Sequence, residues 1–244
     1  MEKIELFPVT GIGELDPGHD LAALVAERFS LADGDVVVFS SKAVSKTEGR
    51  IVAKEQIEPS PFACTLASRI GRSPWYCELI LRESADLVRC APGVVICRTR
   101  HGFVLANAGV DSSNAGGADR FVLLPLDPDG SARKLREAIL SYTGKRVAVI
   151  LSDTFGRPWR LGQTDLAIGT AGLSPLRDYR GQTDHDGRSL AHTCMAQADE
   201  LASAAELVRG KADGIPAVVI RGFAPQGDGP AASLVMPFEQ DLFR

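Results

Sequence analysis

The sequence predicts an α+β fold in which helices pack against mixed sheets. Short apolar runs of strand length alternate with segments whose apolar residues recur at helical spacing, and glycine and proline separate them. Two of the apolar runs are joined by a tight turn, which is typical of an antiparallel hairpin. The regular strand–helix–strand rhythm of a doubly wound sheet is absent, so we expect mixed sheets and not a Rossmann fold.

The first half of the chain starts with an apolar segment and a glycine-rich turn. Apolar residues then recur at helical spacing behind Asp20, whose carboxylate suits an N-cap. In order, we expect a strand over 4–9, a helix over 21–29, a strand over 34–42, helices over 61–70 and 75–88, and a hairpin of strands 93–100 and 102–109 joined by His101 and Gly102.

The second half repeats the alternation. Leu135, Ile139 and Leu140 are expected on the buried face of one helix, and the continuous apolar run over 146–153 is typical of a strand covered on both faces. In order, we expect a strand over 121–125, a turn over 127–130, a helix from Ser131 as N-cap to Gly144 as C-cap, a strand over 146–153, a helix over 198–209 ended by Gly210, and a strand over 214–222.

Composition limits the classes of function. The 244 residues are 45% hydrophobic and 24% charged, which suits one large domain or two intimate subdomains. The net charge of −4 and the lack of a basic stripe give no support for a nucleic-acid partner. No apolar run approaches the roughly 20 residues of a membrane span, and the N-terminus lacks a signal-peptide layout, so we expect a cytoplasmic protein without a membrane partner.

The cysteine pattern also favours a cytoplasmic protein. They are scattered, odd in number and never spaced as CxxC, so we expect free, buried thiols in a reducing cytosol. The five are Cys64, Cys77, Cys90, Cys97 and Cys194.

Two carboxylates stand in similar surroundings. Asp111 lies in LANAGVDSSNAGG and Asp153 in SDTFGRPWRLGQTD, each after an apolar strand and before a hydroxyl residue and a glycine-containing loop. If the two strands are neighbours, these hard oxygen ligands could share Mg²⁺ or Mn²⁺ with a nucleotide phosphate. A surface turn is the alternative interpretation of each segment.

Cationic side chains accompany these segments. Arg157 and Arg160 flank Trp159 and are candidate clamps for a phosphate or carboxylate, because guanidinium donates two hydrogen bonds at once. In FSSKAVSKTEGR (39–50), hydroxyl residues alternate with Lys42 and Lys46, a composition that suits phosphate binding. The alternatives are surface arginines on a turn and an exposed strand end with solvated lysines.

Six stretches, in order along the chain, carry a family resemblance. FPVTGIGEL, DGDVVVFSSKAVSKTEGR, NAGVDSSN, LLPLDPDGSARKLR, VAVILSDTFGRPWRLGQTD and ADGIPAVVIRG resemble the coenzyme F420:L-glutamate ligase family. They run from residue 7 to residue 222 and occur in the family's order.

The resemblance implies an activity and its requirements. A GTP-dependent γ-glutamyl ligase would add L-glutamate to the lactyl carboxylate of the deazaflavin coenzyme F420-0, and then to the growing tail, through an acyl phosphate, releasing GDP and phosphate. Mg²⁺ or Mn²⁺ is implied, and K⁺ stays open as a further ion. The alternatives are a ligase of this family that acts on another carboxylate tail, and a non-catalytic module that binds GTP or the coenzyme.

The resemblance also implies an architecture. We expect one ligase domain over residues 1–244, with two subdomains and an intertwined homodimer. The chain is too short to include the flavin-binding, nitroreductase-like domain that follows in some relatives.

Matched residue by residue, the resemblance assigns roles. Asp111 and Asp153 match divalent-metal carboxylates, Thr154 matches a ligand of a second metal, and Arg157 and Arg160 are our own additions as catalytic clamps. Lys211 and Ala212 stand where the family often has glycine or acidic residues. The positions matched to GTP binding are Ile12, Gly13, Glu14, Leu15, Ser41, Lys42, Lys46, Asn114, Val208, Arg209, Gly210, Lys211, Ala212, Asp213, Gly214 and Ile215.

Overall fold

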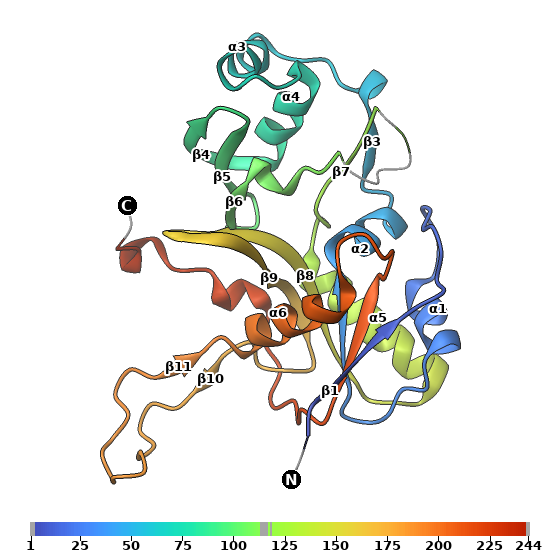
Figure 1. Ribbon diagram of the computed structural model, residues 1–244, viewed down its shortest axis with the longest axis vertical. Helices are drawn as coiled ribbons and strands as arrows, with labels where there is room; N and C mark the ends of the chain where they lie inside the picture. The colour runs from blue at the N-terminus through green and yellow to red at the C-terminus, as the bar shows by residue number, and fades with distance from the viewer. Residues whose placement is uncertain (1–2, 113–116, 118, 243–244) are drawn as a thin grey trace.

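The computed structural model describes residues 3–112, 117 and 119–242. Its centre is a five-stranded mixed sheet (Figure 1), in which β2 and β8 run parallel and the other neighbours run antiparallel. The predicted α+β class with mixed sheets is therefore confirmed. In spatial order the strands are β1 (Glu5–Val9), β12 (Ala217–Arg221), β2 (Val36–Ser40), β8 (Ala148–Arg157) and β9 (Arg160–Ala171).

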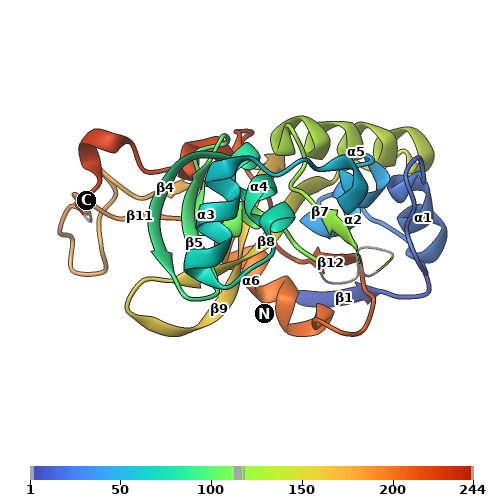
Figure 2. The same ribbon diagram turned by 90° about the horizontal axis from the view of Figure 1, so that it is seen from above.

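Helices cover both faces of this sheet. Side chains of β2 alternate between two apolar cores, because successive residues of a strand point to opposite faces. Val37 and Phe39 pack with α1 (Leu21–Arg28) and α5 (Pro128–Thr143), whereas Val36 and Val38 pack with α6 (Gln197–Arg209). Figure 2 shows α5 and α6 on opposite sides of the sheet.

A second group of elements encloses its own apolar core above this sheet in Figure 1. Two of its helices begin in the same way, with a serine N-cap followed by proline at the first helical position. The group contains α3 (Pro61–Ile70), α4 (Pro74–Glu83) and the antiparallel sheet of β4 (Ser84–Ala91), β5 (Val94–Thr99) and β6 (Val104–Ala106).

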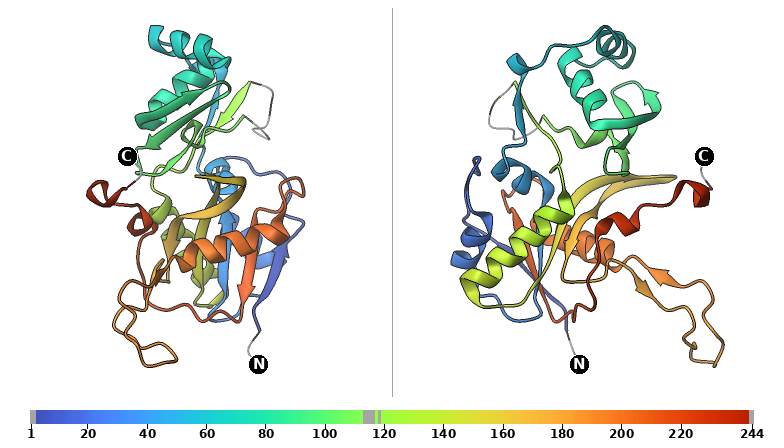
Figure 3. Two further views of the ribbon diagram at one scale, coloured as in Figure 1. Left: turned by 60° about the vertical axis from the view of Figure 1, so that its left-hand side comes forward. Right: turned by 180° about the vertical axis from the view of Figure 1, so that it is seen from behind.

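Short elements complete the described chain. The β10–β11 segment extends away from the body in both views of Figure 3. Within the described ranges, no helix combines the length and apolar character needed to cross a membrane. The short elements are α2 (Ser41–Thr47), the strand pairs β3 (Ile51–Ala53) with β7 (Arg120–Val122) and β10 (Arg177–Asp178) with β11 (Cys194–Met195), and the 3₁₀ turns Lys54–Gln56, Asn107–Gly109, Ala231–Leu234 and Phe238–Gln240.

Several predicted boundaries are wrong. The helix expected over 75–88 ends at Glu83, because β4 pairs with β5 from Ser84 onward. The turn expected over 127–130 is the first turn of α5, since the Asp127 carboxylate accepts a bond from the Gly130 N–H and replaces Ser131 as N-cap. Leu140 lies on the exposed side of α5, whereas Ile139 is buried as expected.

Two corrections concern the candidate site. The strand expected over 34–42 ends at Ser40, whose hydroxyl accepts a bond from the Ala43 N–H and starts α2. The alternative interpretation of this segment as an exposed strand end is therefore wrong. The strand expected over 146–153 continues to Arg157 and turns into β9, so Asp153 lies inside a strand and not at its end. The surface-turn alternative is wrong for Asp153 for the same reason, whereas Pro158 and Trp159 of the same segment do form a turn, at which Trp159 is exposed.

The cysteines are free, as expected, but their burial is mixed. Cys77 and Cys97 are buried in the core of the second group. Cys64 and Cys194 are exposed and Cys90 is partly exposed, so the expectation of buried thiols is wrong for the exposed pair.

The approach of α5 to β9 requires a glycine. A Cβ on Gly169 would lie 2.3 Å from the backbone oxygen of Pro128, whereas a Cβ on Gly156 would meet nothing within 4 Å. We expect Gly169→Ala to lower the free energy of unfolding by about 1–3 kcal/mol, because the first turn of α5 must move away from the strand. Urea denaturation followed by circular dichroism measures the change, with Gly156→Ala as the matched control. Equal stability of the two variants would contradict this packing argument.

Candidate functional site

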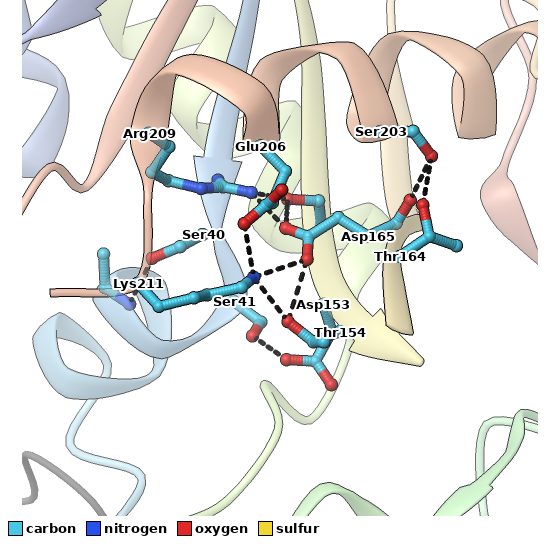
Figure 4. Close-up of polar contacts among 12 residues, drawn as sticks. Ser40, Ser41, Asp153, Thr154, Thr164, Asp165, Ser203, Glu206, Arg209 and Lys211 are labelled. Carbon is cyan, nitrogen blue, oxygen red and sulfur yellow. Dashed lines mark hydrogen bonds and ion pairs between the residues drawn. The ribbon is translucent and has the colours of Figure 1, made fainter. Parts of the chain in front are cut away.

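The parallel pairing of β2 with β8 brings Ser41 beside Asp153. Ser40 lies opposite Ser152 in the register, so the start of α2 follows directly beside the next residue of β8. The Ser41 hydroxyl donates to Asp153 Oδ1 at 2.5 Å (Figure 4). Burial raises the pKa of Asp153 to about 6, and the negative charges of Asp165 and Asp111 act in the same direction.

Asp111 reaches this region from another sheet. Its backbone pairs with Val122 at the end of β7, through N–H···O distances of 3.0 and 2.8 Å. Lys42 Nζ lies 2.5 Å from Asp111 Oδ2, and the charge of Asp111 contributes to the raised pKa of Asp153. The structure therefore brings together Asp111, Asp153, Ser41 and Lys42, although β6, which precedes Asp111, and β8, which contains Asp153, belong to different sheets.

The loop over residues 12–15 joins the same region through Lys46. This lysine is buried on α2, and its ammonium forms an ion pair with the exposed Glu14 carboxylate. Leu15 is buried in the core, and it fixes the loop beside α2. Ile12 and Glu14 also line a pocket that extends along α1 to Leu24.

A second polar cluster surrounds Asp165, which lies opposite Thr154 in the β8–β9 pairing. Asp165 is 2% exposed, and its carboxylate accepts bonds from Thr154 Oγ1 and Lys211 Nζ at 2.8 Å each and from Ser152 Oγ at 3.2 Å (Figure 4). Arg209, which is itself buried, forms an ion pair with the same carboxylate and donates to Ser152 Oγ at 2.8 Å. Burial favours a raised pKa for Asp165, but the Lys211 bond and the Arg209 charge outweigh it, so the pKa is lowered.

Lys211 comes from the loop that follows α6. Gly210 ends the helix with φ +63°, and the chain then turns so that Lys211 Nζ lies 2.8 Å from Thr154 Oγ1 and 3.5 Å from Glu206 Oε1. Together with Asp165, these side chains place three oxygen atoms around one ammonium group. Of the stretch 208–215 matched to GTP binding, Arg209 and Lys211 are thus engaged with Asp165.

The remaining predicted residues lie elsewhere. Arg157 and Arg160 pair with each other at the tip of the β8–β9 hairpin, four residues and about 13 Å along the strand from Asp153. Arg157 Nη2 donates to the Leu161 carbonyl at 2.6 Å. The structure therefore does not bring these arginines to the carboxylates. Asn114 lies outside the described residues.

The rest of the stretch 208–215 mainly shapes the loop. Val208 and Ile215 pack against the core on the α6 side of the sheet. Gly214 has φ +66°, as a tight turn requires, and Gly13 has φ +80° in the loop near α2. Ala212 and Asp213 are exposed.

Sequence reasoning missed Asp165 and Glu206. Asp165 ends the stretch 152–165 that drew attention for its arginines, and recognising a β-hairpin there would have placed it opposite Thr154. The segment lacks a strong hairpin signal, because its turn is Pro158-Trp159 and not a pair such as Asn-Gly. Glu206 carries no signal, since one acidic residue on an amphipathic helix is ordinary.

The residues around Asp111 fit one divalent ion. Within the described chain, no three His, Cys, Asp or Glu side chains gather as a metal site. Two carboxylates suffice for Mg²⁺, however, which keeps several waters and takes further oxygens from substrate phosphates. Burial and the neighbouring charges of Asp165 and Asp111 raise the pKa of Asp153, and a cation bound beside it would favour its charged form. The oxygens around Thr154 do not fit a second divalent ion while Lys211 Nζ contacts them.

Comparison with known proteins identifies the family of this chain. Residues 11–222 match the model of the family described as F420-0:Gamma-glutamyl ligase. The chain therefore belongs to this ligase family, which confirms the resemblance noted in the sequence.

The relatives are similar over nearly the whole chain. The coenzyme F420:L-glutamate ligase of Methanothermobacter thermautotrophicus is 46% identical over 251 residues, covering 99% of both proteins. The ligase of the same name from Methanopyrus kandleri is 45% identical, covering 100% of this chain and 99% of the relative. That of Archaeoglobus fulgidus is 42% identical, covering 99% and 97%.

The two cations on Asp165 should contribute unequally to stability. Arg209 is 4% exposed, so Arg209→Met leaves a buried carboxylate short of a partner, and we expect a loss of about 3 kcal/mol in the free energy of unfolding. The Lys211 side chain is 57% exposed, so Lys211→Met should cost less than about 1 kcal/mol. Urea denaturation of both variants checks the order, and a larger loss for Lys211→Met would contradict it.

Proposed function

We propose that this chain is a GTP-dependent γ-glutamyl ligase that attaches L-glutamate to the lactyl carboxylate of coenzyme F420-0 and then to the growing tail. Membership of the ligase family supports the reaction class. The observation that carries the proposal is the convergence of Asp111 and Asp153 with Ser41, Lys42 and Lys46. These residues come from three separate parts of the chain, and they combine hard oxygen ligands with cations suited to phosphate.

The proposed chemistry proceeds through an acyl phosphate. An oxygen of the acceptor carboxylate attacks the γ-phosphorus of GTP, the bond to the β,γ-bridging oxygen breaks, and GDP leaves. The amine of L-glutamate then attacks the carbonyl carbon, the bond to the phosphate oxygen breaks, and phosphate leaves as the amide nitrogen loses a proton. Phosphorylation is needed because a free carboxylate is a poor electrophile.

The protein's own residues offset the charge of these anions. Asp111 and Asp153 would hold one Mg²⁺ or Mn²⁺, which when bound neutralises negative charge on the triphosphate. Lys42 lies against Asp111 and would move to the phosphates when the metal takes its place. Lys46 is buried and held by Glu14, so its charge is fixed beside the loop over 12–15.

Further parts of the proposal concern binding and assembly. The loops over 12–15 and 208–215, together with Asn114, would contact GTP, and the protein would act in the cytoplasm as a homodimer of two-subdomain chains. A role for K⁺ stays open. The proximity of the first loop to α2 and of the second to Thr154 supports a nucleotide between them.

Incubation with F420-0, L-glutamate, GTP and Mn²⁺ tests the proposal. Mass spectrometry should detect the coenzyme with one or more added glutamyl residues, and no product when GTP is omitted. Asp111→Asn and Asp153→Asn should each lower the turnover rate on the order of 100-fold or more, because each removes a group that offsets transition-state charge.

Asp178→Asn is the matched control. Asp178 is an exposed carboxylate on β10, within the segment that extends away from the site, and its replacement should leave turnover unchanged. Full activity of both Asp111→Asn and Asp153→Asn would contradict the metal assignment. Glutamylation of another carboxylate compound but not of F420-0 would contradict the proposed acceptor.

A further inference from the structure

Lys211 lies where the family resemblance leads us to expect a second metal ion. Thr154 is the residue matched to that metal, yet its hydroxyl oxygen lies 2.8 Å from Lys211 Nζ. We infer that the Lys211 ammonium replaces the second divalent cation, so that this chain binds one divalent ion, at Asp111 and Asp153. The inference rests on the proposed function, because it concerns the cations that accompany GTP at that site.

The geometry around Lys211 is that of an occupied cation position. An ammonium group has three N–H donors, and three oxygens surround this one: Thr154 Oγ1 and Asp165 Oδ1 at 2.8 Å and Glu206 Oε1 at 3.5 Å (Figure 4). The Thr154 hydroxyl uses its own proton on Asp165, so its lone pairs face the ammonium. A metal bound by Thr154 would need the same lone pairs.

The charge balance of this cluster leads to the same conclusion. Asp165 and Glu206 carry two negative charges, and Arg209 and Lys211 carry two positive charges, so the cluster is neutral without a metal. A divalent ion would add uncompensated positive charge beside a carboxylate and a guanidinium that are both nearly fully buried, which is unfavourable.

The cluster of Asp111, Asp153 and Lys42, by contrast, is not electrically neutral. Among the described side chains of this cluster, Asp111 and Asp153 carry two negative charges and Lys42 carries one positive charge, so their sum is one negative charge, which favours a cation. The two clusters also lie on opposite faces of β8. Residues two or four positions apart in a strand point to the same face. Asp153 therefore points to the face of Leu151, which packs towards α5, and Thr154 points to the face of Ile150, which packs towards α6.

The chain holds Lys211 in place through the end of α6. Arg209, two residues earlier, is anchored to Asp165 and Ser152. Gly210 adopts φ +63°, a left-handed conformation that favours glycine, in the turn that returns Lys211 to β9. The ammonium therefore lies on a fixed turn next to a buried anchor.

Counting bound Mn²⁺ tests the inference without turnover. The protein is dialysed against Mn²⁺ and a non-hydrolysable β,γ-imido analogue of GTP, and the metal bound per chain is measured by mass spectrometry. We expect one Mn²⁺ in the wild type. Lys211→Glu should bind two, since it replaces the ammonium with a carboxylate beside Thr154 and Asp165.

Two further variants make the result decisive. Lys145→Glu makes the same charge change on a partly exposed side chain before the start of β8, whereas Asp153 lies inside that strand, and this variant should still bind one Mn²⁺. Lys211→Gln removes the ammonium without adding a charge and should also gain a second ion, which keeps the test available if Lys211→Glu fails to fold. Circular dichroism confirms that each variant is folded.

The inference and the proposed function can fail separately. Two Mn²⁺ in the wild type, none in the wild type, or one in both folded Lys211 variants would overturn the inference, whatever the ligase assay shows. One Mn²⁺ in the wild type and two in the Lys211 variants would uphold it, even if F420-0 gains no glutamate and the proposed function fails.

Discussion

β2 and β8 run parallel at the centre of the five-stranded sheet, and their register determines where the candidate site forms. Both strands are buried on both faces, so a slip of one residue would move apolar side chains between the two cores and is strongly disfavoured. That register aligns Ser40 with Ser152 and so places Ser41 beside Asp153. The contact between these two side chains thus depends on packing several residues away.

The pleat of β8 then separates two kinds of polar cluster. Asp153 projects to the face that also carries α5, and it meets Ser41 and the Asp111 region there. Ser152 and Thr154 project to the α6 face, where Asp165 and Arg209 lie. The clusters are adjacent in sequence but differ in composition. One has an excess of carboxylate, and the other is internally neutral.

Elements with local signals were predictable from the sequence. The N-cap Asp20, the helix 61–70 and the C-cap Gly144 are signalled by residues within a few positions, and the structure confirms them. The helix expected over 75–88 was too long because pairing with β5, which no local residue signals, converts Ser84–Ala91 into a strand. Leu140 was assigned to the wrong side of its helix, since the helical spacing of Leu135, Ile139 and Leu140 allows a buried face centred on either side.

The candidate site was likewise only partly predictable from the sequence. Asp111, Asp153, Ser41 and Lys42 were each visible as polar residues next to apolar runs, and the structure brings them together. Their grouping could not be derived, since it depends on the bridge from Asp111 to Val122 and on a parallel strand pair over 100 residues apart in sequence. Asp165 was missed because its partners come from β8 and from the end of α6. These contacts form only when the β8–β9 hairpin packs against α6, so no local residue signals them.

If the Lys211 ammonium takes the place of a metal ion, as we propose, the neutral cluster would let one substitution alter metal use without altering the fold. The Lys211 side chain is more than half exposed, so its replacement changes little apolar burial. Asp165 keeps Arg209 as a buried partner whichever residue occupies position 211, which leaves the β9–α6 packing intact. An ammonium at this position supplies one positive charge at a fixed place, whereas a metal supplies two and can dissociate. Under the proposed single-ion arrangement, the chain would depend on the solution concentration of divalent ions at one position only, and its affinity for a triphosphate would respond less steeply to that concentration.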